Sequence, residues 1–222
     1  MHILDDPGEL SYRARSFLAR AAVRQREPGS LPERRGPAEL LVSLDHFTDR
    51  YGGMRYDVRR TVSLRGERVV TVRRWQFDLL GAARAERTGW SFGWHGEHVA
   101  SPVRYLAHTD GRFGVSAGGP FLEVSPSFSH LIEGHALMDE LASWEPVPPS
   151  SLEAWTPDDS AGARLRELLA GLPPIAEASG PYDRWWRSEH LAIRLFHGWT
   201  HTEPRRTGIM IWSRTGRISP SP

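Results

Sequence analysis

Apolar positions in the first fifty residues recur every three or four residues, which is the spacing of one helix face. The first run comprises Leu10, Ala14, Phe17, Leu18 and Ala21. It predicts a helix from about Asp5-Asp6-Pro7, where acids and a proline suit a helix start, to about Arg26. The second run comprises Leu40, Leu41, Leu44, Phe47 and Tyr51. Glycines at positions 52 and 53 predict its end, because glycine adopts the left-handed cap without steric strain.

The apolar spacing changes from helical to alternating after Gly53. Alternation from Met54 to Val58 predicts a half-buried strand, and a second strand is expected in the valine-rich and aromatic segment 69–77. Asp110-Gly111 separates two short apolar segments and is a common hairpin turn. A short strand at 121–124 and a helix from Ser125-Pro126 to about Leu141 complete this part.

The last third of the chain is less regular. Residues 146–162 contain four prolines and are interpreted as a linker. A helix at 163–169, strands at 190–200 and 208–214 and a disordered tail at 218–222 are expected beyond it. Helices followed by an antiparallel meander predict an α+β fold, with helices flanking a largely antiparallel sheet and an additional C-terminal helix and hairpin. The predicted divisions are residues 1–36 (helix and loop), 37–145 (main domain), 146–162 (linker) and 163–222 (extension).

Composition excludes several classes of protein. Hydrophobic residues make up 39% and charged residues 25% of the chain, which is typical of a globular protein. No apolar run approaches the roughly 20 residues of a membrane helix, so no membrane partner is expected. The absence of cysteine excludes disulfides and thiolate metal sites. Acids in the first six residues argue against a signal peptide, and we expect a cytoplasmic protein.

Charge is distributed unevenly along the chain. All 28 basic residues are arginine, and 27 acids leave a net charge of +1, which argues against nucleic acid as the partner. No basic residue occurs between Arg112 and Arg164, where eight acids occur. This interval carries −8, and the remainder of the chain therefore carries +9. Such a block is either a solvated acidic surface or a docking patch for a basic partner.

Catalytic and metal motifs lack their usual setting. Ser116 lies in a G-x-S-x-G string, but the residues that follow predict a turn and a strand, whereas a serine hydrolase requires a helix there. His95 and His98 could approach each other around a turn, whereas an extended strand would hold His197 and His201 too far apart for one ion. No third ligand accompanies either pair, and no phosphate-binding loop is present. We therefore expect no metal and no cofactor.

Two further features have both a structural and a functional interpretation. His135 lies on the apolar face of the third helix, one turn before Asp139, and the two could form an acid–base dyad or a structural hydrogen bond. Nine tryptophans are present, most of them expected in the core. Trp90 and Trp94 adjoin a glycine-rich loop and are the candidates for a partly exposed binding surface.

The segment from about Leu40 to Leu141 resembles the SUKH superfamily, the Smi/Knr-like domains. The resemblance rests on Phe47-Thr48-Asp49-Arg50-Tyr51-Gly52-Gly53 at a helix end, on the hairpin around Asp110-Gly111, and on Ser125-Pro126-Ser127-Phe128 at the start of a helix. It implies a non-catalytic immunity protein that neutralises a cognate toxin, often a nuclease.

The resemblance and the charge block together predict where a partner would bind. Because many nuclease toxins are basic, an acidic recognition face is expected at Glu133, Asp139, Glu140 and Glu145. The sequence thus predicts a non-enzymatic, toxin-binding protein, with a serine hydrolase that uses Ser116 as the alternative, and it leaves the oligomeric state open.

Overall fold

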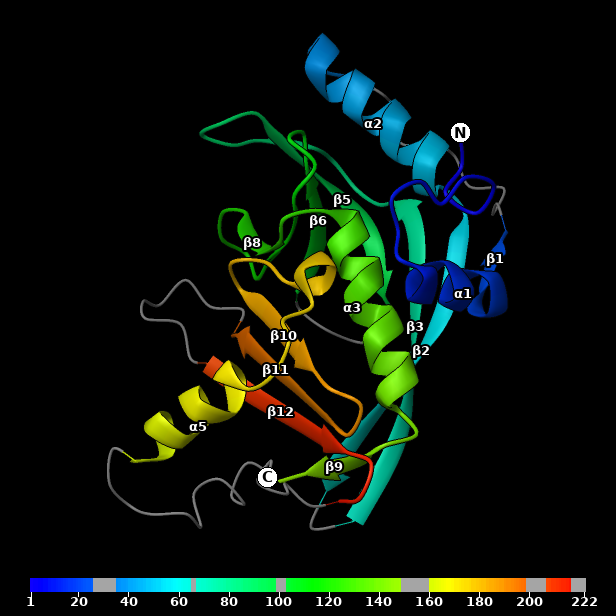
Figure 1. The fold of residues 1–222 in the computed structure, drawn as a ribbon. Coiled ribbons are helices and arrows are strands. Elements are labelled where there is room, and N and C mark those ends of the chain that lie inside the picture. The colour runs from blue at the N-terminus through cyan, green and yellow to red at the C-terminus, as the bar shows by residue number, and fades with distance from the viewer. Residues whose placement is uncertain (26–34, 65–66, 99–102, 149–159, 199–206, 217–222) are drawn as a thin grey trace.

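The computed structural model describes residues 1–25, 35–64, 67–98, 103–148, 160–198 and 207–216 (Figure 1). Its helices are α1 (Tyr12–Ala21), α2 (Ala38–Tyr51), α3 (Phe128–Leu141), α5 (Ser160–Ala170) and the short 3₁₀ helix η1 (Ala176–Ala178). The strands form two antiparallel sheets, and α3 lies between them in the centre of the molecule (Figure 1). The α+β fold predicted from the sequence is confirmed.

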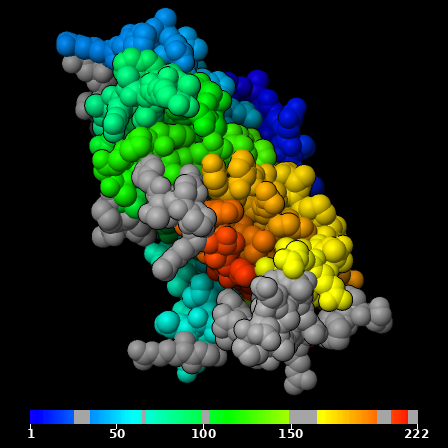
Figure 2. Space-filling model, turned by 90° about the vertical axis from the view of Figure 1, so that its left-hand side faces the viewer, coloured from blue at the N-terminus to red at the C-terminus, as the bar shows by residue number. Residues whose placement is uncertain are grey.

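The large sheet has the order β1-β2-β3-β5-β6-β7-β8, with β4 beside β5. Its strands are β1 (Ala22–Arg24), β2 (Met54–Leu64), β3 (Glu67–Leu79), β4 (Arg84–Ala85), β5 (Trp90–Glu97), β6 (Arg104–His108), β7 (Phe113–Ser116) and β8 (Leu122–Ser125). Its longest ladder joins β2 and β3, from the pair Met54–Phe77 to the pair Leu64–Glu67. The end of this hairpin projects past the rest of the sheet (Figure 2).

The small sheet comes from the last third of the chain. Its order is β10 (Asp183–Arg187), β11 (Leu191–His197), β12 (Thr207–Ser213) and β9 (Glu145–Val147). Alternate side chains separate its two faces, as expected for pleated strands. Ile193 and Ile211 face α5, whereas Ala192 and Trp212 join the main core. The last third therefore shares its core with the rest of the chain, and β9 takes up the first two residues of the segment interpreted as a linker.

The main core consists largely of aromatic rings that α2 and α3 bring onto one face of the large sheet. Phe47 of α2 packs against Phe92, Trp94 and Phe128, with ring centroids 5.3–6.1 Å apart. Ser127 is the N-cap of α3, and its side chain accepts a hydrogen bond from the amide of His130. Edge-to-face packing of this kind adds to the stability that burial alone provides.

Several local predictions agree with the structure and others differ from it. The predicted second helix matches α2, and Gly111, with φ +94°, occupies the turn between β6 and β7. The first helix begins later than predicted, because Ser11 and not Asp5-Asp6-Pro7 provides its cap. It also ends at Ala21, where the chain enters β1 and pairs with β2. The tail at 218–222 lies outside the described residues.

Candidate binding site

Two of the four acids expected on a recognition face are buried in ion pairs. Glu133 is 2% exposed. Its carboxylate accepts hydrogen bonds from the amide and hydroxyl of Ser11, at 2.6 and 2.7 Å, and from Arg13 at 3.2 Å. It therefore joins α3 to the start of α1, and its expected role in docking must be corrected, since a buried carboxylate offers no surface to a partner.

Asp139 is the second buried acid, with a side chain 4% exposed. Its oxygens accept hydrogen bonds from the backbone amide of Arg59 at 3.1 Å and from its guanidinium at 2.9 Å. Arg20 of α1 contributes a further bond at 2.6 Å. Burial acts to raise the pKa of Asp139, but the hydrogen bonds and charge of Arg59, together with Arg20, outweigh it and lower the pKa. Asp139 thus joins α3, α1 and β2, and it is not part of an exposed acidic patch.

The other two acids are exposed but also paired. Glu140 forms a two-pronged ion pair with Arg187, at 2.6 and 2.7 Å, and these bonds lower its pKa. Glu145 lies 3.6 Å from Arg68. All four acids of the expected recognition face are therefore paired with arginines from other parts of this chain.

The tryptophan pair separates on folding. Trp94 is 1% exposed and lies in the aromatic core, so its predicted place on a binding surface is wrong. Trp90, three residues before Gly93 on the same strand, is half-buried. Trp90 and Trp94 are four residues apart on β5, so their side chains lie on the same face of the sheet, and α2 covers that face.

Ser116 does not occupy a nucleophile elbow. It is the last residue of β7, is 5% exposed, and donates a hydrogen bond to the carbonyl of Gly119 at 2.7 Å. Gly118, with φ +91°, turns the chain into β8, so that a strand follows the serine where a hydrolase has a helix. The hydroxyl closes a hairpin turn.

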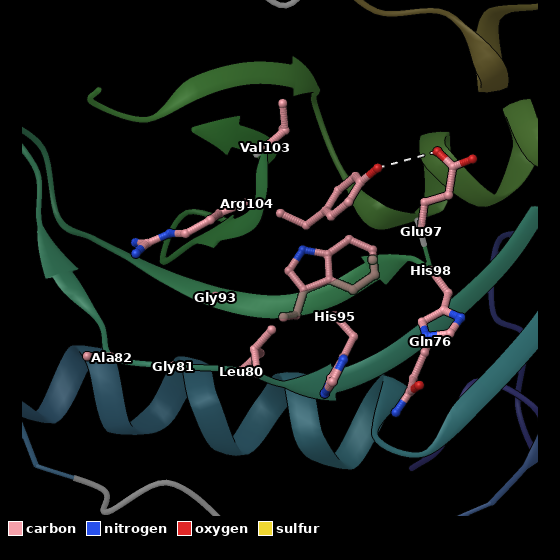
Figure 3. A pocket seen from close by; sticks show the side chains of 13 residues that line it. Gln76, Leu80, Gly81, Ala82, Gly93, His95, Glu97, His98, Val103 and Arg104 are labelled. Atoms are coloured by element: carbon pink, nitrogen blue, oxygen red, sulfur yellow. Dashed lines mark hydrogen bonds between the residues drawn. The ribbon is translucent and has the colours of Figure 1, made fainter. Parts of the chain in front are cut away.

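The candidate histidines lie in different surroundings. The ring of His135 is buried and its Nδ1 lies 2.9 Å from the Tyr56 hydroxyl, while Asp139 binds arginine, so the two do not form a dyad. His95 and His98 line a pocket of about 340 Å³ beside β5 (Figure 3). Among the described residues, no three His, Cys, Asp or Glu side chains are placed to hold a metal ion. His201 falls outside these residues.

The two outer edges of the β2–β3 hairpin differ in how they are covered. In an antiparallel pair, alternate residues direct both backbone groups away from the neighbouring strand. On the β2 side, the amide of Arg59 donates to Asp139, and the carbonyl of Thr61 accepts from the Trp212 indole at 3.3 Å. The side chains of Asp139 from α3 and Trp212 from β12 therefore cover the edge of β2.

On the opposite edge, residues 68–73 of β3 pair with no further strand among the described residues, and we name this segment the β3 edge. Arg59 pairs with Val72 and Thr61 with Val70, so the same alternation directs the backbone groups of Val70 and Val72 outward. Pairing with β5 begins only at Trp75, and in the described part of the chain no hydrogen bond reaches these groups. Val70 is 45% and Val72 59% exposed. An uncovered strand of β-branched residues is a template for strand addition.

One signal in the sequence marks the β3 edge. Residues 69–72 are Val-Val-Thr-Val, so apolar or β-branched side chains occupy both faces of the strand. A half-buried strand normally alternates with polar residues, and this departure marks a segment with more apolar surface than one core face absorbs.

Comparison with protein-family models, with curated proteins and with solved structures yields no match. In the described residues, no helix combines the length and the apolar character required to cross a membrane.

Proposed function

We propose that this chain is a non-catalytic binding protein that captures an extended segment of a protein partner along the β3 edge. The observation that carries the proposal is the contrast between the two edges of one hairpin. Asp139 and Trp212 cover β2, whereas Val70 and Val72 of β3 are exposed, and their outward backbone groups meet no hydrogen-bond partner in the described residues. Exposed edges of this kind invite pairing, and natural proteins usually block them.

The side chains of the β3 edge define the partner segment. Arg68 and Arg73 flank the valines and are 37% and 43% exposed. Arg68 pairs with the exposed Glu145 at 3.6 Å, a surface contact of little stability that can exchange for a carboxylate of a partner. Arg73 lies 3.4 Å from Glu97, whose side chain is only 10% exposed. The fitting segment is therefore a strand with β-branched residues in its centre and acids at its ends. A second copy of the chain fits less well. If the β3 edges of two copies paired antiparallel with Thr71 at the centre, arginines of one copy would lie opposite arginines of the other.

The resemblance to SUKH proteins adds the class of partner to this proposal, namely a toxic protein that the chain neutralises. The mode of contact differs from our expectation, because the acids of α3 are engaged within the chain and the strand edge replaces them. The serine-hydrolase alternative has no support from the surroundings of Ser116, whose hydroxyl is bonded within a turn.

Selection of peptides provides the direct test. A displayed library of random twelve-residue peptides is selected on the folded protein, and the dissociation constants of the enriched peptides are measured. We expect enriched peptides with alternating β-branched residues and terminal acids. Enrichment of helical or basic peptides in their place would contradict the proposal.

A proline substitution separates strand addition from other contacts. Val72→Pro removes an outward amide while leaving the β2–β3 ladder its hydrogen bonds, because this amide does not contribute to that ladder. Binding should weaken by about tenfold or more, the effect of losing one or more backbone hydrogen bonds and local fit. Val42→Lys, at a valine of α2 that is 67% exposed, is the control for loss of an exposed apolar side chain. Unchanged binding to folded Val72→Pro would refute the proposal.

The toxin component has its own test. A toxic domain encoded beside this gene should lose its toxicity when the protein is co-expressed, and the Val72→Pro variant should fail to protect. Protection by Val72→Pro equal to that of the parent would show that the β3 edge is not the neutralising surface.

A further inference from the structure

A cleft of about 410 Å³ separates the two sheets beside α3. The large sheet contributes Arg60, Trp75 and Glu97, and α3 contributes Gly134 and His135. The small sheet contributes Arg194 and neighbouring residues on the face that lies opposite α5. Cavities of this size, with apolar walls and a few polar groups, are typical of sites for small organic molecules.

Two guanidinium groups line the cleft, and they differ in how they are paired. Arg194 is held by Asp183 through two hydrogen bonds, at 2.9 and 2.6 Å, and lies over the rings of Trp185 and Phe196. Arg60 has a longer contact, 3.7 Å, with Glu97, and Glu97 also pairs with Arg73. The Nε of Arg60 is buried, and no acceptor for it is present in the described residues. Arg60 is therefore the cation with unused hydrogen-bonding capacity.

The surroundings of Arg60 favour an incoming anion. Burial lowers the pKa of Arg60 despite the charge of Glu97, and the charges of Arg194 and Arg73 act in the same direction as burial. His135 stays neutral, because burial and the charges of Arg60 and Arg194 lower its pKa well below the usual value. An anion bound near Arg60 would reduce this repulsion between cations.

The remaining wall suits an aromatic body. The rings of Trp75, Phe113 and Phe196 line the cleft, and the carboxylates of Glu97 and Asp183 already accept from arginines. The buried indole N–H of Trp75 has no acceptor in the part of the chain that the structure describes. The cleft thus combines aromatic surface with the cationic side chain of Arg60, while the two donors that have no acceptor among the described residues, Arg60 Nε and Trp75 Nε1, are themselves buried.

We propose that this cleft binds a small aromatic carboxylate, with the carboxylate beside Arg60 and the ring between α3 and the small sheet. The cleft does not include Val70 or Val72, although Glu97 contacts both Arg60 in the cleft and Arg73 of the β3 edge. The proposal for the cleft does not depend on the function proposed for that edge.

Gly134 provides a way to close the cleft without removing a native contact. A Cβ at this position would meet one atom within 4 Å, the indole nitrogen of Trp185 at 3.8 Å. Gly134→Leu should therefore project into the cleft, and Gly134→Ala is the matched control that leaves most of the space open. Both substitutions favour the helix, since glycine is a weak helix former.

The experiment uses 2-naphthoate and its neutral isostere 2-naphthamide, with binding measured by calorimetry and ligand-observed NMR. The parent protein should bind the carboxylate about tenfold or more tightly than the amide, because a charge-assisted hydrogen bond is stronger than a neutral one. Arg60→Met should abolish this preference, Gly134→Leu should abolish binding, and Gly134→Ala should bind as the parent does.

Equal affinity of the parent for naphthoate and naphthamide would overturn the proposal, as would the absence of naphthoate binding. Undiminished binding to a folded Gly134→Leu variant would place the ligand elsewhere and would also overturn it. Val72→Pro should leave naphthoate binding unchanged, and Gly134→Leu should leave peptide binding unchanged, so the failure of one proposal is distinguishable from the failure of the other.

Discussion

Replacement of Asp139 by asparagine tests whether this buried carboxylate holds three elements together. Its side chain is 4% exposed, and its Oδ2 accepts from Arg59 at 2.9 Å and from Arg20 at 2.6 Å. Asparagine keeps one oxygen for the Arg59 amide and Nε, but it directs an NH₂ group at the two guanidinium donors that Oδ2 now serves. The substitution therefore removes two charge-assisted hydrogen bonds and preserves size.

The expected loss of stability follows from these contacts. A hydrogen bond to a charged group contributes about 1.5–3 kcal/mol. Arg59 and Arg20 are 53% and 60% exposed, so both can regain water, and the full sum does not apply. We expect Asp139→Asn to lower the free energy of unfolding by about 2–3 kcal/mol, and the melting temperature by about 4–12 °C for a chain of this size.

Urea denaturation at pH 7, followed by circular dichroism, measures the effect. The midpoint should fall while the slope with denaturant stays the same, which indicates a change in stability without a change in the surface exposed on unfolding. Because the pKa of Asp139 is lowered, its contribution is present above the unfolded-state pKa of about 3.9 and is lost as pH falls through the folded-state pKa. The difference between the two proteins should therefore stay constant near neutral pH.

Glu140→Gln is the matched control, because Glu140 forms an ion pair of similar geometry with Arg187 but is 42% exposed. Exposed pairs contribute about 0–1 kcal/mol. If Asp139→Asn were no more destabilising than Glu140→Gln, the argument that Asp139 joins α3, α1 and β2 would be wrong.

Three further predictions concern other buried groups. His135→Gln removes a group whose pKa is lowered in the folded state. The free energy of unfolding of the parent should therefore fall as pH drops below about 6.5, by up to about 1.4 kcal/mol per pH unit. In urea titrations over pH 7.5–5.0, the variant should lose less stability than the parent. Gly96→Ala should lower the free energy of unfolding by about 2 kcal/mol or more in thermal unfolding, because φ is +68° and the added Cβ would overlap the Tyr105 ring. Gly171→Ala is the control and should be nearly neutral, since its Cβ would meet only atoms at 3.7 Å or farther. Glu133→Gln should cost about 1–3 kcal/mol in urea denaturation, because Arg13 loses its buried carboxylate partner; an unchanged midpoint would contradict the buried ion pair.

Local patterns in the sequence predicted much of the fold. The apolar face of α2, with Leu40, Leu44, Phe47 and Tyr51, is buried as its spacing requires, and the hairpin at Asp110-Gly111 forms. Strand β10 was missed, because Asp-Arg-Trp-Trp-Arg lacks alternation. Its Trp185 is buried against the stacked ring of Trp212, while Trp186 lies on the other face and is only partly buried. Its register depends on β11, which the local sequence does not contain.

The candidate site was poorly predicted, and the charges show why. The acids between positions 113 and 163 are close in sequence, but charge along a chain does not specify which charges meet in space. Glu133 meets Arg13, Asp139 meets Arg20 and Arg59, and Glu140 meets Arg187. These arginines lie from 47 to 120 residues away, and tertiary packing alone brings them into contact.

The sequence by itself determined the helices and most of the strands, because helical and alternating spacing are local properties of the backbone; β9 and β10 lack such a local pattern. Only the tertiary structure decided which edge of the β2–β3 hairpin is covered and which acids reach solvent. Asp139 and Trp212 cover β2 from α3 and β12, at separations of 80 and 151 residues. Coverage of an edge and closure of a cleft depend on such long-range contacts, since each requires side chains from elements that meet only after folding.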